Sequence, residues 1–93
     1  MKNLQGSGRM NIPSNDIIGR DRDSLKRRLA EFLNDRIVEQ KLTQKDAAAR
    51  IGITQPRLSN IINRKIETFS IDAALVAIMN IGYDIEIKPK KVV

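Results

Sequence analysis

The stretch QKDAAARIGITQPRLSNIINRK, residues 44–65, constrains the fold of this chain more than any other segment. Its small and apolar residues predict two short helices joined by a tight turn. Ala47 and Ala48 fall on the inner side of the first helix, where a larger side chain would push the second helix away. Gly52 follows the expected helix end, where a left-handed backbone costs least without a Cβ. We therefore expect two helices that cross steeply at a short turn.

The second of these helices has one apolar and one polar face. Thr54 is suited to cap its N-terminus, and Pro56 falls in the first turn, where a missing N–H is tolerated. Aliphatic residues at the spacing of a buried stripe make the apolar face: Leu58, Ile61 and Ile62. The other face has no acidic residue and carries Gln55, Arg57, Ser59, Asn60, Asn63 and Arg64. Such a helix suits the major groove, so the stretch predicts a helix-turn-helix that reads DNA.

The composition favours an anionic partner and argues against several other classes of protein. The 93 residues suffice for one domain with a small core, but not for a large catalytic cleft. The formal charge is +6 and the pI is about 10.1. Because cysteine and histidine are absent, we expect no disulfide, no metal, no cofactor and no enzymatic activity. No apolar run approaches the roughly 18 residues of a membrane span. Without an apolar secretory segment either, we expect a cytoplasmic protein with no membrane partner.

The pattern of helices predicts an all-α fold, a small helix-turn-helix bundle of four to five helices. The first helix is expected from Asp23 or Ser24 to Gln40, and the last from a Ser70 cap to Gly82. Three parts follow along the chain. They are a flexible or extended N-terminal arm (1–22), the helix-turn-helix DNA-binding domain (23–82), and a C-terminal strand with a basic tail (83–93).

Three basic residues occupy the first turn of the first expected helix, where positive charge opposes the helix dipole. They are Lys26, Arg27 and Arg28. Contact with a phosphate or a partner would explain them, and so would an exposed surface under weak selection. The sequence leaves both explanations open.

Residues 83–88, YDIEIK, alternate between apolar and charged side chains, which predicts a strand. Tyr83, Ile85 and Ile87 lie on its apolar side. A lone strand leaves its backbone groups unpaired, so it needs a partner. A second copy of the chain would supply one, and we expect these three residues to form a homodimer across a two-fold axis. The alternative is a tail that packs on its own monomer, near Met10 to Ile12.

The expected DNA contacts divide into base-reading and phosphate-contacting residues. The base-reading residues are Gln55, Arg57, Ser59 and Asn60. The phosphate-contacting residues are Thr43, Gln44, Thr54, Asn63, Arg64 and Lys65. A single copy would read about four base pairs, whereas two copies about 34 Å apart would double the site. The expected partner is therefore double-stranded DNA with an inverted repeat.

The segment LTQKDAAARIGITQPRLSNIINRK, residues 42–65, resembles the lambda-repressor/Cro class, or XRE-type helix-turn-helix proteins. The resemblance implies phosphate contacts for Gln44 and Asn63, and base reading for Gln55. Pro56 departs from repressors that place a polar base contact at that position. Residues 25–90 are also similar to small XRE-type antitoxins grouped with HigA, on the segments FSIDAAL and IGYDIEIKPK.

The second resemblance implies an autorepressing antitoxin that neutralises a small ribonuclease toxin. A stand-alone or phage-type repressor is an alternative with the same fold. A further alternative, of another class, is a protein-interaction module that neutralises a partner without binding DNA. The acid-free face of residues 54–65 favours DNA binding over that module.

Overall fold

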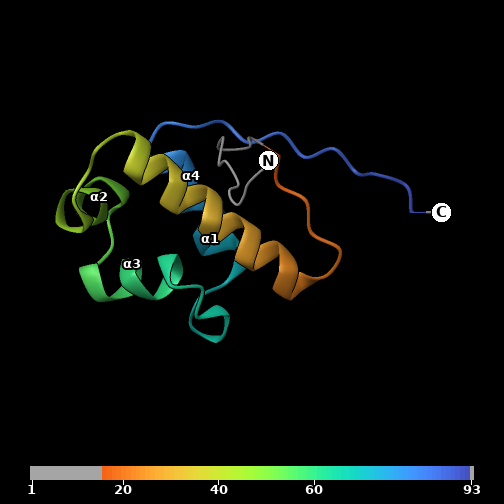
Figure 1. Ribbon diagram of the computed structural model, residues 1–93, viewed down its shortest axis with the longest axis horizontal. Helices are drawn as coiled ribbons and strands as arrows, with labels where there is room; N and C mark the ends of the chain where they lie inside the picture. Colours follow the sequence, from red (N-terminus) through yellow and green to blue (C-terminus); the bar gives the residue numbers. More distant parts are fainter. Residues whose placement is uncertain (1–15, 93) are drawn as a thin grey trace, which may run out of the picture.

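The computed structural model describes residues 16–92 and contains four α-helices and one short 3-10 helix in that range (Figure 1). Their bounds are α1 Arg22–Glu39, α2 Gln44–Ile51, α3 Gln55–Ile62, η1 Ile66–Thr68 and α4 Ile71–Asn80. The predicted all-α bundle is confirmed at this level. Most of the expected arm, residues 1–22, lies outside the described residues, as does the packing expected near Met10 to Ile12.

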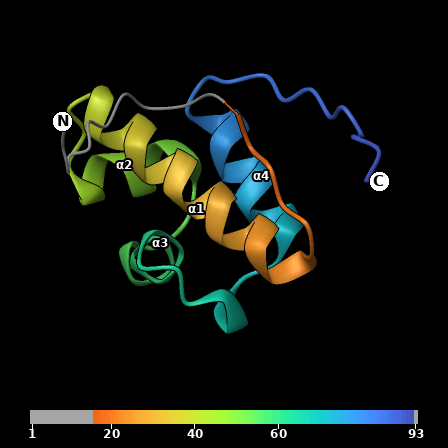
Figure 2. The ribbon, with the colours of Figure 1, turned by 45° about the vertical axis from the view of Figure 1, so that its right-hand side comes forward.

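The core lies between α1 and α4, with α2 and α3 packed across them. It is mainly aliphatic, because aromatic residues make up only 3% of the chain. Leu29, Leu33, Leu58 and Ile78 are its largest fully buried side chains. Figures 1 and 2 show α2 and α3 side by side, with α3 and the C-terminal segment on opposite sides of α1.

Hydroxyl side chains cap three of the four helices, as the sequence predicts. Thr43 accepts a hydrogen bond from the N–H of Asp46 at the start of α2, over 3.0 Å. Thr54 and Ser70 cap α3 and α4 in the same way. The side chain satisfies one backbone donor that the first helical turn leaves without a partner, and so each helix begins where the cap stands.

The predicted start of α1 is wrong by one to two residues. The N-cap is Asp21 rather than Asp23 or Ser24. Asp21 Oδ1 accepts from the Ser24 N–H at 2.8 Å, and Ser24 Oγ accepts from the Asp21 N–H at 3.1 Å. Ser24 therefore serves as the third residue of a reciprocal capping box, which outcompetes a cap further along the chain.

The segment before α1 is held against the first turn of that helix. Ile17 is half-buried and packs on the core. A Cβ added at Gly19 would lie 2.6 Å from the Cα of Leu25, so only glycine fits this approach. Ile17 and Gly19 therefore lie against the helical domain, N-terminal to the predicted boundary at residue 23.

The predicted strand at residues 83–88 is absent from the single chain, since residues 16–92 contain no strand. Tyr83 and Ile85 are half-buried and pack on the core, whereas Ile87 is 77% exposed. The Tyr83 ring meets Phe32 edge-on with centroids 5.6 Å apart. Strand structure needs a hydrogen-bonded neighbour, and none lies beside this segment within the described chain. The first half of the segment thus follows the alternative of packing on its own monomer.

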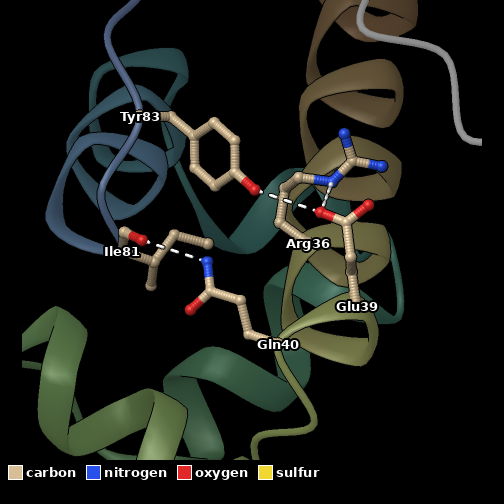
Figure 3. Close-up of polar contacts among 5 residues, drawn as sticks. All are labelled: Arg36, Glu39, Gln40, Ile81 and Tyr83. Atoms are coloured by element: carbon tan, nitrogen blue, oxygen red, sulfur yellow. Dashed lines mark hydrogen bonds and ion pairs between the residues drawn. The ribbon is translucent and has the colours of Figure 1, made fainter.

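The end of α1 is joined to the start of the C-terminal segment by polar contacts (Figure 3). Tyr83 donates its hydroxyl to Glu39 Oε1 at 3.2 Å, and Arg36 Nε lies 3.6 Å from the same oxygen. Gln40 Nε2 donates to the carbonyl of Ile81 at 3.1 Å. These contacts fix the point at which the chain leaves α4.

Candidate nucleic-acid interface

The turn between α2 and α3 has the geometry that the small residues predict. Ala47 and Ala48 are 0% and 2% exposed, so the two helices meet closely at these methyl groups. Gly52 has φ +90°, and its N–H donates to the carbonyl of Ala48 at 2.8 Å. Ile53 is half-buried and packs on the core. The motif is well fixed because its inner side chains are buried and its turn is hydrogen-bonded.

The outer face of α3 presents the expected base-reading side chains to different degrees. Gln55 and Arg57 are exposed, whereas Ser59 and Asn60 are half-buried. The opposite face is in the core, where Leu58 and Ile61 are 0% and 4% exposed. A helix anchored in this way can present the amide of Gln55 and the guanidinium of Arg57 to base edges without moving its backbone.

Two of the predicted contact residues are bonded to each other. Asn63 Nδ2 donates to Ser59 Oγ over 3.1 Å, one turn apart on the exposed side of α3. A hydroxyl that accepts one hydrogen bond can still donate its own hydrogen, and the amide nitrogen carries a second N–H. Ser59 and Asn63 therefore form one paired donor surface rather than two independent contacts.

Two predicted phosphate-contacting residues also act as helix caps. The Thr43 and Thr54 hydroxyls accept from the backbone N–H of Asp46 and Arg57, at 3.0 and 3.3 Å. Both residues are exposed, and each hydroxyl hydrogen remains available as a donor. The exposed Gln44 follows Thr43 at the first position of α2, where the helix dipole favours an anion. Capping and phosphate binding are thus compatible at these positions.

The loop after α3 carries two exposed cations. Arg64 has a left-handed backbone with φ +59°, and Lys65 follows it. The Lys65 N–H donates to the carbonyl of Asn60 at 3.0 Å, which closes the end of the helix. This backbone geometry places both cations next to the last turn of α3.

The charged residues of α3 and of the loop that follows it, up to residue 65, are all basic. Residues 54–65 include Arg57, Arg64 and Lys65 and no acidic residue. Within residues 16–92, no group of three or more histidine, cysteine, aspartate or glutamate residues could hold a metal ion. In the same range each helix is too short or too polar to cross a lipid bilayer.

Lys26 has a structural role that the sequence did not indicate. Its Nζ donates to the carbonyl of Ile66 at 2.9 Å and lies 5.8 Å from the centroid of the Phe69 ring. The side chain therefore braces η1, the segment that follows α3. Neither explanation offered for this residue from the sequence, a phosphate or partner contact or an exposed surface, describes that role.

The sequence also did not predict the side-chain hydrogen bonds that join α2 to other helices. Asn80 Nδ2 donates to the carbonyl of Ile51 at 2.8 Å, and Arg50 donates to Gln40 Oε1 at 3.2 Å. These amides join α2 to the ends of α4 and α1. No local signal marks them, because asparagine and glutamine near helix ends are common and their partners are distant in sequence.

The fold and this face together define a DNA-binding protein of the helix-turn-helix class. The family described as Helix-turn-helix domain matches residues 17–90, and the chain belongs to that family. Comparison with curated proteins and with solved structures gives no match. The predicted helix-turn-helix protein is confirmed, and the family boundary at residue 17 agrees with the seating of Ile17 on the core.

Proposed function

We propose that this protein is a sequence-specific transcriptional regulator that reads double-stranded DNA with α3. The observation that carries the proposal is the exposed, acid-free face of a helix whose other side is anchored in the core. Gln55 and Arg57 read bases, with Ser59 and Asn60 beside them. The phosphate contacts come from Thr43, Gln44, Thr54, Asn63, Arg64 and Lys65.

The regulator acts as a homodimer on an inverted repeat. One reading helix covers too few base pairs for useful specificity, and a two-fold pair spaced by about 34 Å doubles the site. The apolar side of the C-terminal segment supplies the pairing surface through Tyr83, Ile85 and Ile87, of which Ile87 is exposed in the single chain. In Figure 1 this segment extends past the N-terminal end of α1, which would allow two copies to lie side by side.

A gel shift on the DNA upstream of its own gene tests the reading face. Gln55→Ala should lose about 1–3 kcal/mol on the preferred site and relax its specificity. Lys65→Ala should weaken binding to all sequences alike, because a phosphate contact carries no base information. Lys91→Ala, in the C-terminal tail, is the charge-matched control. If Gln55→Ala and Lys65→Ala both bind like the parent, the reading face is wrongly assigned.

The finer proposal is an autorepressing antitoxin. Its support is the similarity of residues 25–90 to HigA-type antitoxins. Exposed apolar side chains on α4 add to it, with Val76 at 41% and Met79 at 47%, since a partner protein could cover them. Co-expression with the product of the neighbouring gene tests it. Rescue from a toxic ribonuclease, lost in Met79→Lys, is the expected result.

The same experiments separate the alternatives. Selective operator binding without any toxic neighbour would indicate a stand-alone repressor. Weak binding to every duplex, together with a copurifying partner, would indicate a protein-interaction module.

A further inference from the structure

All four α-helices within residues 16–92 are followed, one or two residues after their last residue, by a residue with a positive φ. After α2 and α4 this residue is glycine, Gly52 with φ +90° and Gly82 with φ +105°. After α1 and α3 it is a basic residue, Lys41 with φ +58° and Arg64 with φ +59°. A side chain with a Cβ is disfavoured in this conformation, and glycine is its usual occupant. The two exceptions lie at the two ends of the helix-turn-helix.

The hydrogen bonds at both exceptions are those of an ordinary helix end. The N–H of Lys41 donates to Val38 and that of Leu42 to Ile37, at 3.0 and 3.1 Å. The N–H groups of Arg64 and Lys65 make the equivalent bonds after α3, at 2.9 and 3.0 Å. The backbone geometry is therefore one that glycine would adopt at lower cost.

Contacts of the two side chains do not explain their presence. Lys41 and Arg64 are exposed, and neither side chain makes a hydrogen bond or ion pair with the described part of the chain. A cation just beyond a helix C-terminus gains some energy from the helix dipole. That benefit would apply equally after α2 and α4, where the chain uses glycine. The dipole alone therefore does not account for the pattern.

Lys41 lies close in sequence to an expected phosphate contact. It stands two residues before Thr43, the N-cap of α2, whose exposed hydroxyl can donate to a phosphate. The loop that carries Lys41 and the loop that carries Arg64 lie at opposite ends of the α2–α3 pair in Figures 1 and 2. A lysine stem spans several ångströms, so its ammonium can meet a phosphate beside the one bound at Thr43.

We propose that Lys41 is a phosphate-binding residue on the flank of the helix-turn-helix opposite to Arg64, and that its charge is retained at the expense of backbone strain. The inference rests on the proposed DNA-binding function and adds a contact to it. Together the two cations would bracket the reading helix and set its register on the duplex.

The test uses the full-length chain, a duplex of the upstream region and a mixed-sequence duplex, with Kd measured from 50 to 200 mM salt. Lys41→Gly and Arg64→Gly should each keep or raise the Tm and weaken binding to both duplexes. Each should also reduce the slope of log Kd against log salt by about 0.9, the value for one lost phosphate contact. Lys41→Arg should keep the parent slope.

Lys90→Gly is the matched control, because it removes the same charge from the C-terminal tail and should leave the slope unchanged. A parent that binds neither duplex would refute the proposed function itself. A parent that binds, with Lys41→Gly keeping the full slope, would refute only the role of Lys41. A Tm clearly below that of the parent would also refute it, since the residue would then be structural.

Discussion

Gly52 makes the turn between α2 and α3 through backbone conformation alone. An added Cβ at this position would meet no atom within 4 Å, so space is not what excludes other residues. Its φ of +90° is what an L side chain rarely adopts. Gly19 is the opposite case, since the Cβ there would collide with Leu25. Two glycines of one small domain are thus needed for different physical reasons.

We predict that Gly52→Ala lowers the free energy of unfolding by about 1–2 kcal/mol, the cost of a left-handed L residue. Chemical denaturation of the variant measures this. Gly52→Asn, which tolerates the conformation better, should lose less. Equal losses for alanine and asparagine would mean that the turn depends on something other than backbone conformation.

We predict that Ala48→Leu costs about 1–3 kcal/mol of stability by overpacking the helix crossing, and that it weakens DNA binding as well. Ala48 is 2% exposed, whereas its neighbour Ala49 is exposed on the same helix. Ala49→Leu is therefore the matched control and should change neither property. Thermal denaturation measures the loss of stability, and the gel shift measures the loss of DNA binding. An Ala48→Leu protein as stable and active as the parent would contradict the proposed crossing.

At the scale of elements, each of the four α-helices within residues 16–92 begins at a side-chain cap, and the caps differ in chemistry. Thr43, Thr54 and Ser70 are neutral, whereas Asp21 is charged. Hydrogen bonds from Ser24, first from its backbone N–H and then from its hydroxyl, lower the pKa of the Asp21 carboxyl below its usual value of 3.8. The start of α1 is therefore sensitive to acid, and the starts of the other helices are not.

The sign of this effect can be tested. Because the pKa of Asp21 is lower in the folded state, its contribution to stability is complete above pH 3.8 and is lost as the pH falls through the lowered value. Asparagine caps equally well but does not titrate. We predict that Asp21→Asn flattens the fall of Tm between about pH 5 and pH 2 relative to the parent. A curve parallel to that of the parent would show that the charge of Asp21 contributes nothing.

At the scale of the whole molecule, α3 and the C-terminal segment lie on opposite sides of α1 (Figure 2). Gln40 links the two sides, because its amide bonds Ile81 on one side and Arg50 of α2 on the other. Gln40 therefore ties the point where the chain leaves α4 to the end of α2. Beyond Ile85, this segment is free of the core and open to pairing.

We predict that Ile87→Lys reduces the molar mass in solution from a dimer to a monomer without lowering the Tm of the monomer fold. The reason is that Ile87 is 77% exposed in the single chain, so its substitution removes no core packing but would disrupt the proposed interface. Light scattering after gel filtration measures the mass. Val92→Lys, at a side chain 71% exposed, is the control and should stay dimeric. A parent that is already monomeric would contradict the dimer proposal.

Local features were predictable from the sequence because the forces behind them act within three or four residues. The caps Thr43, Thr54 and Ser70, the glycine turn at Gly52 and the buried stripe of α3 all belong to this group. The cap of α1 was misplaced because Asp21, Asp23 and Ser24 are all good capping residues. Only the reciprocal bonds of Asp21 and Ser24 decide between them.

Tertiary structure alone decided which polar side chains bridge distant parts of the chain. Lys26 reaches Ile66 across 40 residues, Gln40 reaches Ile81 across 41 and Asn80 reaches Ile51 across 29. It also decided that residues 83–88 hold no strand in one chain, because a ladder needs a second set of backbone groups. The amino-acid order thus determined the helices and the acid-free outer face of α3. Folding in three dimensions determined how that face is braced, because such contacts depend on where the helices pack.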